Sequence, residues 1–316
     1  MKRFKNILVG VDLSVGDRFV GVELTPPSEE ALRRALWLAR LNGARLHLLY
    51  ALDISPHAQR LIQKATGSQS TVMDAARDKL AELVERVRHV RVEAASSAVY
   101  GKSWLELIRQ VLRGGHDLVV SGTRSLGAMH GMLVGSTGKK LLRKCPCPVW
   151  ITQPRTDEAI SRILVATDLT PVGATALELG HSMASLHDAQ LHVLYVLDNS
   201  EELYLRLGSV PVGMIQDHRN SAEQAARITI AEQLDRLGAD GLSHSPAVHV
   251  IEGWPADSIA DLISRESIEL LVMGTVARSG VQGFFMGNTA ERLLPQVACS
   301  ILAVKPEGFV SPVTLD

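Results

Sequence analysis

The chain has 316 residues, which is enough for two ordinary domains that each bury a core of their own. Its hydrophobic content of 46% and charged content of 21% are globular values and argue against a disordered protein. The net charge of −1 means that the protein has no overall positive potential, and an aromatic content of 4% argues against a surface for stacking bases. Nucleic acid is therefore not expected as a partner.

The N-terminal sequence predicts a cytoplasmic protein. It begins with basic residues, but the apolar run that follows, Ile7–Val11, ends at Asp12 and is too short for the core of a signal peptide. No segment of the sequence approaches the roughly 20 apolar residues of a membrane helix, so no membrane partner is expected.

Short apolar runs alternate with amphipathic segments along both halves of the chain. Nearly continuous apolar strands separated by helices are typical of a parallel sheet covered on both faces. The expected strands are residues 7–11, 46–49, 90–94, 118–120 and 149–152 in the first half, and 163–166, 191–196, 247–251, 270–273 and 301–304 in the second.

Helix signals fall between these runs. The first helix is expected to be capped by Ser28 and to stop at Gly43, and its counterpart to begin at Thr170 and Pro171. The remaining helices are expected at 72–87 and from 103 and 135 in the first half, and at 217–237 and from 256 and 287 in the second.

The two halves are copies of one another. Asn6-Ile-Leu-Val-Gly-Val-Asp12 matches Arg162-Ile-Leu-Val-Ala-Thr-Asp168, and the second strands share a Leu-His-x-Leu-Tyr-x-Leu-Asp pattern. The repeat predicts two tandem flavodoxin-like, Rossmann-like α/β domains, each a five-stranded parallel sheet with helices on both faces. We expect the domains at 1–153 and 162–310, with a linker at 154–161 and a tail at 311–316.

The first half carries an extra segment, residues 15–27, between its first two strands. It is expected beside the crevice at the carboxyl ends of the strands, where it would be either a lid or a surface excursion. Three cysteines, Cys145, Cys147 and Cys299, are expected as buried small side chains at strand starts. A metal or redox pair at Cys145 and Cys147 is the alternative, without a supporting ligand nearby.

An acidic residue ends the first strand of each half, Asp12 and Asp168. Such a carboxylate can cap the following helix, accept from a ribose hydroxyl or coordinate a magnesium ion. A glycine loop also follows the fourth strand of each half, from Gly122 to Thr137 and from Gly274 to Thr289. Glycines before a helix N-terminus allow backbone N–H groups to approach phosphate, although a plain turn is the alternative for either copy.

These features resemble the universal stress proteins, over nearly the whole chain and in tandem. The resemblance rests on the loop spacing Gly-x2-Gly-x9-Gly-Ser/Thr, the Val-Asp and Thr-Asp strand ends, Gly253-Trp-Pro-Ala-Asp-Ser-Ile259 and the closing Cys-Pro-Val-Trp. It implies that ATP or another adenine nucleotide, with or without Mg2+, is a cofactor. In the first half the site would use Asp12, Gly122, Ser125, Gly135, Ser136 and Thr137, and in the second Asp168, Gly274, Ala277, Gly287, Asn288 and Thr289.

Both loops depart from the family pattern. Ser125 and Ala277 replace the second glycine, and Asn288 replaces the hydroxyl residue of the second loop. If that glycine position needs positive φ, a β-carbon costs roughly 1–2 kcal/mol there. Basic residues without an acid surround the first loop, whereas Glu291 lies among the basic residues of the second. A triphosphate should therefore prefer the first half.

No reaction-bearing motif is present: the sequence has no Gly-x-Ser-x-Gly elbow, Walker loop or His-Glu-x-x-His. His47 and His192 recur on the second strands and are expected to serve packing, while His244 and His249 could share a metal. No metal site is predicted.

The resemblance thus predicts a nucleotide-sensing regulator of stress survival without efficient turnover, and the stress role rests on it alone. Its alternatives are an interaction scaffold with degenerate pockets and a slow ATPase, for which no base stands out. The domains are expected to form an intramolecular pseudo-dimer through their fifth strands, 149–152 and 301–304, and a homodimer remains open.

Overall fold

The structure is a computed structural model that describes residues 3–14, 19–66, 72–125, 132–155, 159–198, 202–275 and 287–315. The described residues form two compact units. Residues up to 155 form the first unit together with 309–315, so the last segment of the chain lies with the first unit; the rest form the second.

The first unit is an α/β sandwich around five parallel strands, in the order β7-β4-β1-β2-β3. The strands are β1 (Asn6–Gly10), β2 (Arg45–Leu52), β3 (Ala94–Tyr100), β4 (Leu118–Gly122) and β7 (Val149–Thr152). The helices are α1 (Pro26–Asn42), α2 (Pro56–Thr66), α3 (Val72–His89), α4 (Ser103–Gly114) and α5 (Ser136–Lys144). A short hairpin of β5 (Arg124–Ser125) and β6 (Met132–Leu133) precedes α5.

The second unit repeats this plan with the strand order β10-β9-β8-β11-β12. Its strands are β8 (Arg162–Thr167), β9 (Gln190–Asp198), β10 (Ala247–Gly253), β11 (Leu270–Gly274) and β12 (Ser300–Val304). Its helices are α6 (Pro171–His187), α7 (Glu202–Leu207), α8 (Val212–Arg236), α9 (Pro255–Arg265) and α10 (Asn288–Leu293), with a 3-10 turn at Ala239–Gly241.

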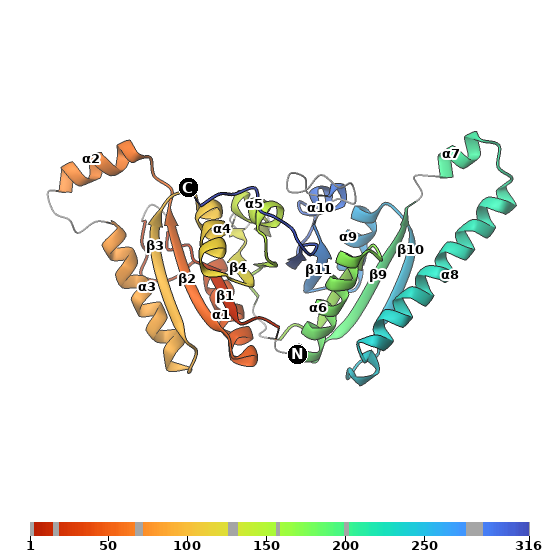
Figure 1. Cartoon of the computed structure of the whole chain (residues 1–316), viewed down its shortest axis with the longest axis horizontal. Helices are drawn as coiled ribbons and strands as arrows, with labels where there is room; N and C mark the ends of the chain where they lie inside the picture. The colour runs from red at the N-terminus through yellow and green to blue at the C-terminus, as the bar shows by residue number, and fades with distance from the viewer. Residues whose placement is uncertain are drawn as a thin grey trace. The chain divides into compact units, whose positions relative to one another are not determined.

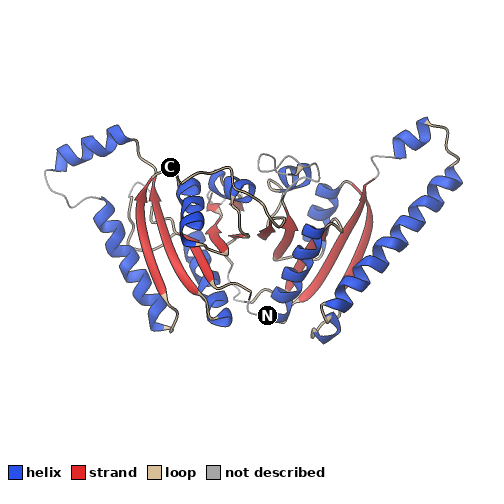
Figure 2. Cartoon of the chain, viewed as in Figure 1, coloured by secondary structure: helices blue, strands red, loops and turns tan. Residues whose placement is uncertain are grey.

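Each sheet lies between layers of helices, as Figures 1 and 2 show for either unit. In the first unit α1 packs on β4, α4 on β1 and β2, and α3 on β3; in the second, α6 packs on β8 and α9 on β9. Ile7, Leu8 and Val9 of the central strand β1 are fully buried. Each such side chain contributes roughly 1.5–3 kcal/mol, which is why these apolar runs become the middle of a covered sheet.

Three local expectations are wrong. The third strand begins at Ala94 rather than Val90, because α3 continues to His89 and the chain then turns through Arg91 at φ 62°. Ser28 does not cap α1, whose N-cap is Thr25. Helix α8 begins at Val212 rather than near Asp217.

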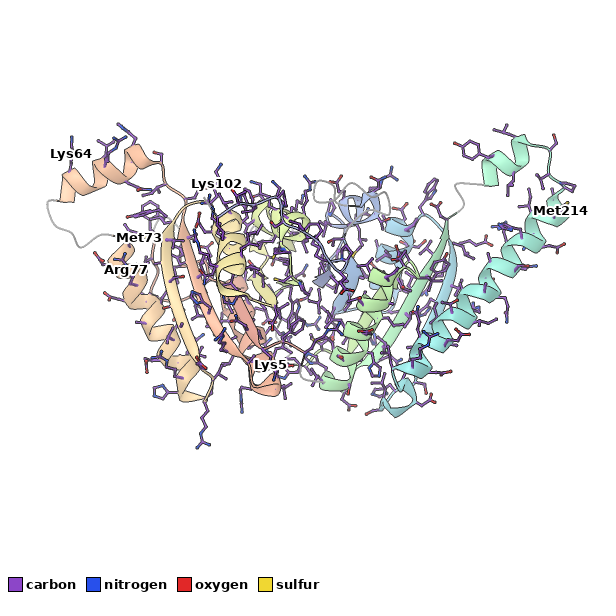
Figure 3. All side chains as sticks on the ribbon, in the orientation of Figure 1. Lys5, Lys64, Met73, Arg77, Lys102 and Met214 are labelled. Carbon is purple, nitrogen blue, oxygen red and sulfur yellow. The ribbon has the colours of Figure 1, made fainter. Side chains whose placement is uncertain are left out.

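The sequence does not reveal the early start of α8, because Ile215 is the one buried residue in the first turns of this helix. Its first turns extend beyond the strands, where Met214 is 64% exposed (Figures 1 and 3). The short helices α2 and α7 have no counterpart among the expected elements.

Candidate functional site

A cavity of about 560 Å³ opens at the carboxyl ends of the first unit's strands. The ends of β1, β2 and β4, the first turn of α1 and the start of α5 meet there because carboxyl ends of parallel strands share one edge of a sheet. Of the residues expected at a nucleotide site, the cavity brings together Asp12, Gly122, Gly135, Ser136 and Thr137. Ser125 lies in β5 of the hairpin, paired with Met132.

Asp12 is held in place through its backbone. Its N–H donates to Ser28 Oγ at 3.0 Å, and the Ser28 hydroxyl donates back to the Asp12 carbonyl at 3.1 Å. The carboxylate accepts from the Ser14 N–H at 2.9 Å and remains exposed. Asp12 therefore does not cap α1, and its side chain stands on the cavity wall as an acceptor.

Tyr50 is a cavity residue that sequence reasoning missed. It lies at the end of β2, is 2% exposed, and its hydroxyl donates to the Phe19 carbonyl at 3.0 Å. Burial is the main cause that raises the pKa of the Tyr50 hydroxyl, with Asp12 adding to it. Phe19 also lines the cavity, so part of the extra segment lies beside the site as expected. The recurrence of this tyrosine as Tyr195 in the second half was a signal that could have identified it.

The start of α5 lines one side of the cavity. Gly135 is its N-cap with φ −67°, and no side chain caps the helix. The first N–H groups of a helix have no intrahelical partner, so those of Ser136 and Thr137 are donors for a phosphate. The helix has basic residues and no acid, but Lys140 and Lys144 lie over the Trp104 ring, at 5.1 and 5.0 Å from its centroid.

Gly122 has a packing reason to be glycine. A β-carbon at this position would lie 2.3 Å from the Pro27 carbonyl oxygen and 2.6 Å from its carbon. The close approach seats the first turn of α1 on the end of β4. Ser125 belongs to β5, where an extended backbone is the norm, so the strain proposed for a β-carbon at this position stays a prediction.

The second unit arranges its equivalent residues differently. Asp168 Oδ1 accepts from the Thr170 N–H and hydroxyl at 3.1 and 2.5 Å, and Thr170 in turn caps α6. This carboxylate thus serves the turn before the helix. A β-carbon on Gly274 would meet only the Val172 side chain, at 3.2 Å. Leu169 of this turn has φ 60°.

Lys305, the residue after β12, lies beside Thr275, the residue after β11. The Lys305 ammonium donates to Thr275 Oγ1 at 2.9 Å, and both residues are buried. Gly287 donates its N–H to the Thr275 carbonyl at 3.1 Å and is the N-cap of α10, which is six residues long. Asn288 is exposed and Thr289 half-buried, while Ala277 lies outside the described residues.

The described part of the chain contains no group of three or more His, Cys, Asp or Glu side chains that could hold a metal. His249 pairs with His192 rather than His244. The cysteines Cys145, Cys147 and Cys299 are buried, as expected, and the first two sulfur atoms lie 3.6 Å apart. Among the described residues, no helix has the length and apolar character needed to span a membrane.

Comparisons with known proteins agree with the tandem reading. The family model described as the universal stress protein family matches residues 3–153 and 159–305. Universal stress protein E of Photorhabdus laumondii is 24% identical over 339 residues, covering 99% of this chain and 98% of the relative. Universal stress protein E of Escherichia coli K12 is 26% identical over 331 residues, covering 100% and 98%.

Two solved structures share the fold of the whole chain. A functionally unknown protein from Pseudomonas aeruginosa PAO1 aligns with a TM-score of 0.69 at 21% identity, covering 98% of this chain and 95% of that one. A universal stress protein from Archaeoglobus fulgidus aligns with a TM-score of 0.65 at 17% identity, covering 95% and 98%.

Proposed function

Because the chain belongs to the universal stress protein family, with two family domains in tandem, we propose that its first domain binds an adenine nucleotide. The protein would act in the cytosol as a nucleotide-dependent regulator of stress survival, without efficient turnover. The observation that carries this proposal is the 560 Å³ cavity at which Asp12, Gly135, Ser136 and Thr137 converge.

The cavity has a separate feature for each part of a nucleotide. The uncapped start of α5 supplies backbone donors and the positive end of the helix dipole for the phosphates. The carboxylate of Asp12 supplies an acceptor for a ribose hydroxyl. Leu49, Ala51 and Leu52 supply an apolar wall at the end of β2 for a base. The cavity combines an apolar wall with many polar groups, and a pocket of this volume is within the range of small-molecule sites.

We propose a different role for the second domain, as an interaction scaffold with a degenerate site. Its Asp168 carboxylate is engaged by Thr170, and Lys305 supplies a buried cation beside the glycine loop. Two family domains in one chain also support an intramolecular pair. We do not propose a slow ATPase activity, because no residue stands out as a base for the attacking water.

Calorimetry with MgATP tests the site in the first domain. Gly135→Val should reduce affinity at least tenfold, because a branched side chain at the head of α5 blocks the approach to its first N–H groups. The backbone at φ −67° is open to valine, so loss of binding would not arise from backbone strain. The matched control is Gly287→Val, at the equivalent position with φ −60°. Equal affinity of wild type and Gly135→Val would refute the proposal.

A further inference from the structure

A histidine pair lies at the second strand of each domain, toward the edge opposite the nucleotide cavity. In the first domain the rings of His47 on β2 and His116 before β4 have centroids 5.6 Å apart and an interplanar angle of 70°. In the second, His192 on β9 and His249 on β10 are stacked at 5.4 Å and 4°. His47 and His192 are equivalent positions, so both copies place a second imidazole beside the same strand residue.

The pair in the second domain joins two neighbouring strands directly. His192 Nδ1 and His249 Nε2 are 3.2 Å apart, so one nitrogen carries the hydrogen and the other accepts it. Two protonated rings cannot share this bond, because each nitrogen would then carry a hydrogen. Strand β10 pairs only with β9 among the strands of this unit, so the bond secures an outer strand.

The charges around the second pair oppose proton uptake overall. Burial is the first cause that lowers the pKa of both His192 and His249, and His249 lowers the pKa of His192 further. Arg162, Arg227 and Arg265 act in the same direction, while Glu266 on the neighbouring helix end acts against them.

The pair in the first domain, a half-buried His47 and a buried His116, lines a cavity of about 220 Å³. His116 is 6% exposed, and its Nδ1 has no hydrogen-bond partner among the described residues. His47 Nε2 lies 2.9 Å from Ser97 Oγ. Burial first, and then the neighbouring His47 and Arg45, lower the pKa of His116 to about 4. Glu93 lines the same cavity and is the acid facing it.

We propose that the two histidine pairs form an acid-responsive switch, in which protonation of both rings of a pair separates them and loosens the sheet beside the second strand. Neutral imidazoles can lie side by side at these sites, whereas two charged rings would repel one another. The ring pairs are an independent feature of the fold, and this inference does not depend on nucleotide binding.

The direction of the pH effect follows from the lowered pKa values. The unfolded chain takes up protons near pH 6.5, whereas the folded pairs do so only at lower pH, so the stabilisation is present above pH 6.5 and is lost as pH falls through the lowered pKa values (about 4 for His116). For His116 alone, the folding equilibrium constant should fall by up to roughly 30-fold between pH 7.5 and 5.

Hydrogen exchange on the full chain at pH 7.5 and 5.0, corrected for intrinsic rates, tests the switch. Protection of β2, β3, β9 and β10 should fall at pH 5.0 in the wild type. The fall should be several-fold smaller in the neutral variants His116→Gln and His249→Gln, each in its own domain. The control is His218→Gln, at an exposed position on α8.

Comparing each variant with itself at two pH values separates the switch from a uniform loss of stability. An NMR titration of the histidine ring protons provides a second readout. Equal pH dependence in wild type and both pair variants, or His116 and the pair in the second domain titrating near 6.5, would overturn the proposal.

Discussion

Alanine at Gly122 should destabilise the first domain even without a ligand. The new methyl group would lie 2.3 Å from the Pro27 carbonyl oxygen, 2.6 Å from its carbon and 2.8 Å from its β-carbon. The nearest of these atoms belong to backbone at the start of α1, so no side-chain rotation relieves the contact. The first turn of α1 must move, and it carries Ser28, which holds Asp12.

Forcing extra atoms into a packed interior costs about 1–3 kcal/mol. A backbone collision at 2.3 Å belongs at the upper end, so we expect a loss of about 3 kcal/mol. Gly274→Ala is the matched control, since the nearest atoms to its methyl would be Val172 Cγ1 at 3.2 Å and Cγ2 at 3.3 Å, both in a side chain. That side chain can shift slightly, and the lower entropy of unfolded alanine offsets about 0.4–1 kcal/mol, so the net change should be near zero.

Urea unfolding followed by tryptophan fluorescence measures the difference. Trp37, Trp104 and Trp150 lie in the first domain, whereas Trp254 of the second is 58% exposed, so the signal reports mainly on the first. Gly122→Ala should shift the midpoint of this transition strongly to lower urea, and circular dichroism should show little effect of Gly274→Ala. An unchanged midpoint for ligand-free Gly122→Ala would refute the packing argument and leave phosphate approach as the reason for the glycine.

The remaining predictions concern single contacts. Ser125→Gly should leave MgATP affinity unchanged in calorimetry, because Ser125 is paired with Met132 in β5, where residues are normally extended; a tenfold gain would contradict this. Tyr50→Phe should lose about 1 kcal/mol in urea unfolding through its bond to the Phe19 carbonyl, and equal stability would show that the bond contributes nothing. Thr170→Ala should lose about 1 kcal/mol because its hydroxyl caps α6, whereas Thr25→Ala, without a capping bond, should lose less; equal losses would count against the cap.

The sequence was sufficient for the fold because its signals are local and repeated. Nine of the ten expected strands coincide with observed ones, the third overlaps its strand only at Ala94, and the bounds of β7, Val149 to Thr152, agree to the residue. Gly43 ends α1 in the left-handed conformation, and Thr170 with Pro171 begins α6, as the capping rules predict. Two copies of each signal made the tandem α/β reading secure.

The errors occurred where a tertiary contact decides the outcome. Ser28 has the chemistry of an N-cap, but its hydroxyl is used by the Asp12 backbone, a partner distant in sequence. Sequence patterns also do not reveal that Pro27 lies against Gly122, whose role toward phosphate stays a prediction. They do not reveal either that Lys140, one of the basic residues near the first loop, lies over Trp104. The Ala277 position lies outside the described residues, so its role stays a prediction.

Native mass spectrometry with added MgATP tests the central claim most directly, since it counts nucleotides per chain. One adenine nucleotide should bind per wild-type chain, and one should still bind to Gly287→Val, because the first-domain cavity is intact in both. At the same MgATP concentration the bound fraction of Gly135→Val should be at least several-fold lower. A wild-type chain that binds no nucleotide, or a Gly135→Val chain that binds as much as the wild type, would contradict the assignment of the site to the first domain.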